Sequence, residues 1–374
     1  MHFSESAVPT PPTPGTPPPA PGLKPLAPQP EPLGAVLAPR AIVLGGPSAG
    51  KLPTLTIGAR LRGRSVLVDT DLTPDEIGEV LDTAARLKKL RQAGKAHGYL
   101  AGKTLGLIFQ HPSTRTRVAF EAGMAQLGGQ AIFLGVNDLQ IKRGETIADT
   151  AQVLSRYVDA IVARVARHSD LEELAGAASI PVLNGLTDKA HPMQALSDLL
   201  TLQERFGRLG GLKLAYLGDG NNVCHSLLLA GAAMGVSVAV GAPAGYQPSP
   251  DVVTQASWLA AASGTGATIA VSEDPFAAVD GADAVYTDVH VSMGQQDGAA
   301  RAVALLPYKV TQKIMAAAKP GAVFMHCLPM HRNEEVEAAV ADGPQSIIYD
   351  QAENRLHLHK AILLHALCSP EAGW

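Results

Sequence analysis

The feature that most constrains this chain is an alternation of short apolar runs with longer helix-forming segments, which continues from about residue 103 to the C-terminus. Short apolar runs bounded by Gly, Pro, Asn or Asp are typical of buried strands. Strands that alternate with helices form parallel sheets that helices cover on both faces. The predicted strands are 103–109, 130–135, 159–164, 180–186, 213–220, 236–243, 266–274, 282–289, 322–329 and 346–351.

A long helix predicted over 192–207 divides this alternation into two halves. We therefore predict an α/β fold with two doubly wound parallel-sheet domains joined by helices. The first domain covers 65–200 and the second covers 201–351, and a C-terminal helix over 352–369 packs back on the first. In such folds ligands bind beyond the carboxyl ends of the strands, where loops from both halves can meet.

A capping pattern indicates where the first long helix begins. Thr73 is a suitable N-cap, Pro74 occupies the first helical position and Glu76 stands three residues after the cap. In such a capping box the cap side chain and the acidic side chain each accept a hydrogen bond from the other's backbone N–H. We therefore predict a helix that starts directly after Thr73.

The N-terminal segment has a different composition. Proline dominates residues 8–32, so residues 1–64 are predicted to be a disordered, polyproline-like tail. Residues 45–51 match the GxxxxGK pattern of a phosphate-binding loop, but Leu52 replaces the expected hydroxyl residue and Pro53 disfavours a following helix. We interpret this match as chance.

The composition also narrows the classes of function. Lys and Arg number 30 against 34 Asp and Glu, a net charge of −4, which argues against a nucleic-acid or membrane-surface partner. Three cysteines in 374 residues fit a reducing compartment, and no apolar signal segment precedes the fold, so we expect a cytoplasmic protein. The uncharged stretch 226–250 is too rich in Gly, Ala, Ser and Pro to span a membrane.

The sharpest local signal is the segment 113–117, Ser-Thr-Arg-Thr-Arg, between a predicted strand and a predicted helix. A helix N-terminus carries partial positive charge, so Arg115 and Arg117 are unfavourable there unless a strongly negative group such as a phosphate binds between them. An ordinary serine N-cap with two solvated arginines explains the same residues. The local features favour neither interpretation.

A second glycine-rich turn follows the strand predicted at 213–220. Gly218 and Gly220 fit a dinucleotide-binding turn, but Val223 stands where a third glycine is expected, and the later acidic residue is missing. An NAD-dependent dehydrogenase is therefore a weak alternative. We expect a tight turn that presents Asn221 and Asn222 to a small ligand.

Several separated motifs lie in order along the chain. They are STRTR (113–117), HPMQALSDLLT (191–201), GDGNNVCHSLL (218–228), DVHVSMGQ (288–295) and HCLP (326–329), with DLTPDEI (71–77) and AENR (352–355) near the ends. Together they resemble the aspartate/ornithine carbamoyltransferase family, and in particular its ornithine-specific members, over about 65–370, outside the Pro-rich tail. The resemblance implies two α/β domains, trimers or multiples of trimers, and no metal or organic cofactor. It also implies transfer of the carbamoyl group of carbamoyl phosphate to the δ-amino group of L-ornithine, giving L-citrulline and phosphate in arginine metabolism.

The resemblance also assigns residues to each substrate. Gln140 corresponds to a residue that reaches the phosphate of a neighbouring subunit, and the Leu328 carbonyl to one that holds the carbamoyl NH₂. The residues expected to bind carbamoyl phosphate are Ser113, Thr114, Arg115, Thr116, Gln140, Arg164, His191, Gln194, Cys327, Leu328 and Arg355. Those expected to bind ornithine are Asn222, Asp288, Ser292 and Met293. Catalytic roles fall to Arg115, Arg164, His191, Asp288 and Cys327.

Other roles for these residues stay open. His191 could cap a helix, Asp288 could be an ordinary strand-end carboxylate, and Cys327 could be a small buried side chain, or could orient the amine or accept its proton. Cys327 with His326 and His331 would supply three zinc ligands, but a fourth at suitable spacing is lacking, so no metal is expected.

The identity of the acceptor amine stays open. His290 stands where members of the family commonly have an aromatic residue, so putrescine, an N-acylated ornithine or aspartate is an alternative acceptor. An aspartate-specific enzyme should carry basic groups in place of the HCLP segment, which favours ornithine. A non-catalytic scaffold that uses the Pro-rich tail is a further alternative. The sequence does not distinguish citrulline synthesis from the reverse reaction.

Overall fold

The computed structural model describes residues 52–53, 55, 59–291 and 298–368. The Pro-rich segment and the GxxxxGK match at 45–51 lie outside these residues. Folded structure begins before residue 64, where the tail was predicted to end. A 3-10 helix spans Ala59–Leu61, the Leu61 side chain is buried, and the Gly63 N–H donates to the Ala366 carbonyl.

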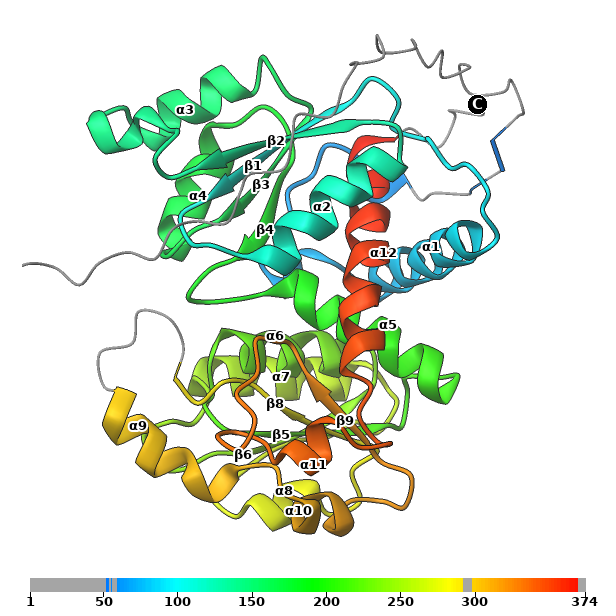
Figure 1. Ribbon diagram of the computed structural model, residues 1–374, viewed down its shortest axis with the longest axis vertical. Coiled ribbons are helices and arrows are strands. Elements are labelled where there is room, and N and C mark those ends of the chain that lie inside the picture. The colour runs from blue at the N-terminus through cyan, green and yellow to red at the C-terminus, as the bar shows by residue number, and fades with distance from the viewer. Residues whose placement is uncertain (1–51, 54, 56–58, 292–297, 369–374) are drawn as a thin grey trace, which may run out of the picture. The chain divides into compact units, whose positions relative to one another are not determined.

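The first half of the fold is a four-stranded parallel sheet in the order β2-β1-β3-β4 (Figure 1). Alternate residues face opposite sides, so Leu107 packs in one hydrophobic cluster and Ile108 in another, and helices cover both faces. The strands are β1 (Thr104–Phe109), β2 (Gln130–Gly135), β3 (Ala160–Arg164) and β4 (Val182–Leu186). The helices are α1 (Pro74–Gln92), α2 (Thr114–Gln126), α3 (Ile147–Leu154) and α4 (His168–Ala177).

The second half is a five-stranded parallel sheet in the order β7-β6-β5-β8-β9. Its central strand β5 therefore pairs with β6 on one side and with β8 on the other. The strands are β5 (Lys213–Leu217), β6 (Ser237–Gly241), β7 (Ile269–Ser272), β8 (Ala284–Thr287) and β9 (Val323–His326). The helices are α6 (Asn222–Ala233), α7 (Pro250–Ala262), α8 (Pro275–Val279), α9 (Gly298–Leu305), α10 (Gln312–Ala317) and α11 (Ala338–Ala341).

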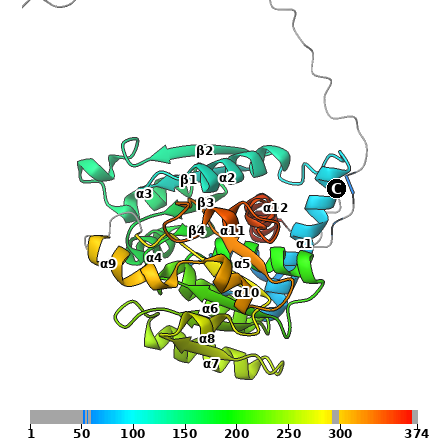
Figure 2. The ribbon, with the colours of Figure 1, turned by 60° about the horizontal axis from the view of Figure 1, so that its bottom comes forward.

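Two long helices connect the halves. α5 (Pro192–Phe206) leads from the first sheet into the second, and α12 (Ile348–Leu367) returns from the second half and packs against α1, α2 and α5 (Figures 1 and 2). The two-sheet α/β architecture predicted from the sequence is thus confirmed. The capping box is also confirmed, because the Glu76 N–H donates to Thr73 Oγ1 and the Thr73 N–H donates to Glu76 Oε2.

The strand predicted at 346–351 is wrong. Ser346 forms an isolated bridge with Phe324, and α12 begins two residues later. The apolar pair Ile347 and Ile348 suggested a strand, but α12 starts at Ile348, where Ile348 is buried and Tyr349 is 71% exposed, and the helix becomes buried on all sides over 357–366. The C-terminal helix accordingly spans 348–367 and not 352–369.

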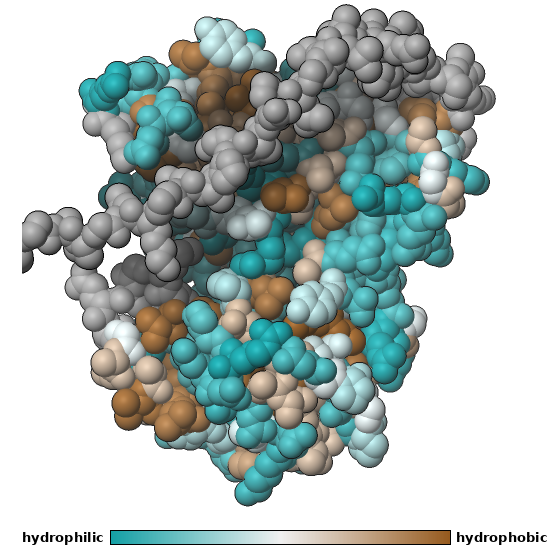
Figure 3. Space-filling model, viewed as in Figure 1, coloured by the Kyte–Doolittle hydropathy of each residue, from teal (hydrophilic) through white to brown (hydrophobic). Residues whose placement is uncertain are grey.

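The stretch 226–250 contains part of α6, the strand β6 and the first residue of α7. Among the described residues, no helix combines the length and the apolar character needed to cross a membrane. The face shown in Figure 3 is largely hydrophilic, with hydrophobic residues gathered over α9, where Val303 is exposed. Leu306, in the 3-10 helix that directly follows α9, is exposed as well.

Candidate active site

The first sheet reverses its strand order between β1 and β3. Crevices at such reversals bind ligands at the carboxyl ends of the strands. The Ser113–Arg117 segment follows β1, and Arg164 is the last residue of β3. Ser113 caps α2 by accepting a hydrogen bond from the Thr116 N–H at 3.4 Å. The fold therefore brings the segment singled out from the sequence and Arg164, from a later strand, to one sheet edge.

Three arginines lie within electrostatic reach of one another at this edge, and we call Arg115, Arg164 and Arg355 the arginine cluster. Burial, followed by repulsion from Arg115, lowers the pKa of Arg164 to about 10. Burial, followed by repulsion from Arg115 and Arg164, lowers the pKa of Arg355 to about 10. Among the described residues, none of the three forms an ion pair with a carboxylate, and each has a buried Nε atom without a hydrogen-bond partner. Two half-buried guanidinium groups and one buried one, without a carboxylate partner among the described residues, fit a site for an anion.

Arg117 does not belong to this cluster. Its Nε donates to Glu121 Oε1 at 3.0 Å, and its guanidinium lies 3.7 Å from the centre of the Phe133 ring. The hypothesis that both arginines of the segment face an anion therefore does not hold for Arg117, which the family resemblance had not assigned to either substrate. The local residue pattern alone could not separate Arg115 from Arg117, because Phe133 approaches α2 only in the folded sheet.

Thr116 and Arg355 connect α2 to α12. Arg355 Nη2 donates to Thr116 Oγ1 at 2.6 Å, and both side chains are buried. Since the threonine oxygen accepts this bond, its hydroxyl hydrogen remains available to donate to a ligand.

His191 is the N-cap residue of α5, but its side chain makes no capping hydrogen bond. It is buried, and its Nδ1 has no partner among the described residues. Burial, followed by the positive charges of Arg355 and Arg164, holds its pKa well below the usual value. The structure therefore excludes helix capping by this side chain and presents a neutral imidazole beside the arginine cluster.

Gln194 lies one turn further along α5. Its Nε2 donates to Asp198 Oδ1 at 2.9 Å, while its buried Oε1 has no partner in the described part of the chain. Asp198 also accepts hydrogen bonds from Gln351 at 2.8 Å and from Tyr286 at 3.0 Å. Burial raises the pKa of Asp198 to about 7. Asp198 was not predicted from the sequence, although its position four residues after Gln194 places both on one helix face.

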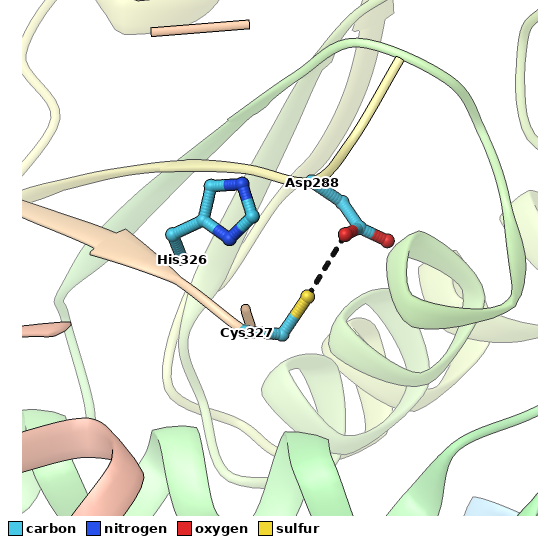
Figure 4. A group of neighbouring side chains, drawn as sticks. All are labelled: Asp288, His326 and Cys327. Atoms are coloured by element: carbon cyan, nitrogen blue, oxygen red, sulfur yellow. Dashed lines mark hydrogen bonds between the residues drawn. The ribbon is translucent and has the colours of Figure 1, made fainter. Parts of the chain in front are cut away.

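The second sheet reverses its order between β5 and β8, and a second group of polar side chains lies there. We call Asp288, Asn221 and Cys327 the Asp288 network. Asn221 Nδ2 donates to Asp288 Oδ2 at 2.8 Å, and the Cys327 thiol donates to Asp288 Oδ1 at 3.0 Å (Figure 4). Burial, followed by the charge of Asp288, raises the pKa of Cys327 well above its usual value, so the thiol stays protonated.

The arginine cluster and the Asp288 network act on each other electrostatically. The pKa of Arg115 is lowered by burial, while Cys327 and Asp288 act in the opposite direction. Arg115 follows a strand of the first sheet, and Asp288 and Cys327 follow strands of the second, so residues at the carboxyl ends of both sheets lie close enough to interact.

The HCLP segment has an unusual backbone. Leu328 adopts a positive φ of 61°, and its N–H donates to His326 Nδ1 at 2.8 Å. Because Nδ1 accepts, Nε2 carries the ring hydrogen and faces Glu335 Oε1 at 3.2 Å. A strained residue held by buried hydrogen bonds is a common feature of functional sites.

The zinc interpretation receives no support from His331. Ligand-type atoms of Asp288, His326 and Cys327 lie within 4.8 Å of one another, whereas His331 belongs to a separate group with Glu334 and Glu335. In the first group the His326 Nδ1 and the Cys327 thiol are already joined to protein hydrogen-bond partners.

The remaining predicted residues are placed as follows. Asn222 Nδ2 donates to the Thr187 carbonyl at 2.6 Å. Gln140 lies in a 3-10 helix and accepts a hydrogen bond from Arg143 at 3.4 Å, so its contacts among the described residues are local. Ser292 and Met293 lie outside the described residues.

Comparisons with known proteins agree with this architecture. The carbamoyl-phosphate-binding domain of the aspartate/ornithine carbamoyltransferases matches residues 64–204, and their Asp/Orn-binding domain matches residues 210–366. These two matches place the chain in that class of two-domain proteins.

Individual relatives indicate which members of this class the chain is similar to in sequence and structure. An ornithine carbamoyltransferase of Pyrococcus abyssi is 51% identical over 315 residues, covering 84% of this chain and 99% of the relative. The structure of ornithine carbamoyltransferase from Pyrococcus furiosus has a TM-score of 0.80 at 50% identity and covers 84% of this chain and 99% of its own. The enzyme from Thermus thermophilus has a TM-score of 0.73 at 40% identity, covering 81% and 99%. The chain belongs to the aspartate/ornithine carbamoyltransferase family.

Proposed function

We propose that this protein is an ornithine carbamoyltransferase, which transfers the carbamoyl group of carbamoyl phosphate to the δ-amino group of L-ornithine. The observation that carries the proposal is the arginine cluster, which has no carboxylate partner among the described residues and lies within electrostatic reach of the Asp288 network. A site with one cationic and one acidic side suits a phosphate donor and an amine acceptor. The relatives of about 50% identity support the same activity.

The donor half of the site supplies hydrogen-bond donors for the phosphate. Ser113, Thr114, Arg115 and Thr116 at the start of α2 hold the phosphate, with Arg164 beside them. Helix N-termini favour such anions because their first N–H groups have no partner within the helix.

The carbamoyl group then lies between donors and acceptors. Thr116, Arg164, Arg355 and His191 donate to its carbonyl oxygen, which gains negative charge when the amine attacks, and donors of this kind lower the barrier. The Gln194 Oε1, which has no partner among the described residues, accepts from the carbamoyl NH₂, together with the Leu328 carbonyl.

The acceptor half holds ornithine. Asn222, Asp288, Ser292 and Met293 bind its amino-acid end, and the δ-nitrogen approaches the donor beside Cys327. The δ-amine attacks in its neutral form, which desolvation in the site favours. Its lone pair forms the new C–N bond while the C–O bond to phosphate breaks. Because the Cys327 thiol is protonated, it orients the amine and does not accept its proton. The departing phosphate, which carries negative charge, takes up that proton.

Oligomeric state and location form part of the proposal. A homotrimer, or a multiple of trimers, lets Gln140 reach the phosphate of a neighbouring subunit, which fits the local character of its contacts within this chain. The three cysteines are free and buried, which supports a cytoplasmic enzyme of arginine biosynthesis. The carbamoyl group arrives already activated by its phosphate, so the reaction calls for no cofactor.

The test is a carbamoylation assay with carbamoyl phosphate and a panel of amines: ornithine, putrescine, N-acetylornithine and aspartate. We expect the highest kcat/KM with ornithine and the formation of citrulline and phosphate in equal amounts. A higher kcat/KM with another amine would assign the protein to a different carbamoyltransferase, and turnover of none would overturn the proposal.

A further inference from the structure

We infer that Asp69 and Ser226 are positioning residues that fix His191 in the geometry needed for carbamoyl transfer. The inference rests on the proposed function, because it gives His191 a donor role in that reaction. It starts from a buried hydrogen-bond chain that joins three distant segments of the sequence.

The chain consists of two short hydrogen bonds. The His191 N–H donates to Ser226 Oγ at 2.8 Å, and the Ser226 hydroxyl donates to Asp69 Oδ2 at 2.7 Å. All three residues are buried. Asp69 lies in the 3-10 helix Asp69–Asp71, which packs against α6, the helix that carries Ser226.

The direction of these bonds explains the need for a hydrogen-bond acceptor at position 69. A serine hydroxyl has one hydrogen and two acceptor lone pairs. Asp69 as a carboxylate can only accept, so it takes the hydroxyl hydrogen and leaves a lone pair for the His191 N–H. Without this acceptor the hydroxyl is free to rotate, and the His191 backbone loses a defined partner.

The backbone of His191 needs such support because its side chain does not cap α5. Its carbonyl already accepts from the Gln194 and Ala195 N–H groups. The bond to Ser226 fixes the N–H of the same residue. The imidazole is therefore attached to a backbone that is held at both its N–H and its carbonyl. Small displacements of a catalytic group reduce the rate more than they reduce ground-state binding.

The experiment compares Ser226→Ala, Asp69→Leu and Asp69→Asn by steady-state kinetics. We expect Ser226→Ala and Asp69→Leu to lower kcat by about tenfold or more, with the KM for ornithine changed less than about twofold. Asp69→Asn keeps an acceptor oxygen and should retain most of the kcat. Asp71→Asn is the matched control and should keep the wild-type kcat, because Asp71 accepts from the Leu67 and Val68 N–H groups of the same segment.

A double-mutant cycle then tests whether Ser226 acts through His191. Once His191→Ala has removed the imidazole, adding Ser226→Ala should lower kcat no further. An equal further loss, or a folded Ser226→Ala variant with wild-type kcat, overturns the inference. If Ser226→Ala does not fold, the two Asp69 variants decide the question. Equal losses of kcat in Asp69→Leu and Asp69→Asn would then overturn the inference, because it predicts a loss in Asp69→Leu alone. A wild-type protein that forms no citrulline instead refutes the proposed function.

Discussion

The charged side chains at the two points where the strand order reverses differ in their protein partners. The arginine cluster at the first has buried Nε atoms without partners among the described residues, whereas Asp288 at the second accepts from Asn221, Cys327 and the Val289 N–H. The guanidinium groups of the first region therefore have no acidic partner among the described residues, whereas the carboxylate of the second region has several protein donors. The difference fits the proposal that an anion binds at the first region and an amine at the second.

The largest expected effect is on the first region. Arg115→Ala should weaken carbamoyl-phosphate binding by about 3 kcal/mol, because a charge-assisted contact to the phosphate is lost. Titration calorimetry with carbamoyl phosphate measures this change. Arg117→Ala is the matched control, since Arg117 pairs with Glu121, and near-normal affinity in Arg115→Ala would remove Arg115 from the site.

A smaller effect is expected from the second region. Asp288→Asn should lower kcat/KM for ornithine by about 2 to 3 kcal/mol of transition-state stabilisation, because the ammonium groups of ornithine lose their acidic partner. The KM for carbamoyl phosphate should stay close to the wild-type value. Equal losses for both substrates would contradict the separation of the two regions.

Stability should depend on pH through Asp69. Burial raises its pKa to about 6, so its contribution is fully present below its unfolded pKa and is lost as the pH rises through 6. Between pH 5 and pH 8 the loss amounts to about 1 to 2 kcal/mol, and Asp69→Asn should abolish it. Urea unfolding at fixed protein concentration tests this, with the exposed Asp75→Asn as control. An unchanged pH slope in Asp69→Asn would contradict the assignment.

The smallest effect concerns Cys327. A protonated thiol that only orients the amine is replaced well by a hydroxyl, so Cys327→Ser should lower kcat by less than about fivefold, or about 1 kcal/mol. The pH profile of kcat for Cys327→Ser and the wild-type protein measures both the size of the loss and any shift in pH dependence. A loss of several hundredfold with a shifted profile would show that a thiolate takes part in the reaction.

Local patterns in the sequence predicted local structure well. The capping box at Thr73 and Glu76 formed as expected, because both partners lie within one helical turn. The strand predicted at 346–351 failed because the short apolar pair Ile347 and Ile348 suits a strand and a buried helix start equally.

Contacts between distant segments could not be predicted from local patterns in the sequence. The local residue pattern does not separate Arg115 from Arg117, because the Phe133 ring that accompanies Arg117 comes from the next strand, and only the family resemblance assigned Arg115 alone. Asp69 and Ser226 are 157 positions apart, so their hydrogen bond becomes visible only in the fold. The assigned roles of the remaining site residues stay predictions.

The central claim is that an anionic donor completes the arginine cluster. The most direct measurement is a crystal structure of the protein with carbamoyl phosphate. We predict its phosphate at the start of α2, within hydrogen-bond distance of Ser113 to Thr116. Water alone at that position, with the arginines paired to carboxylates, would contradict the account.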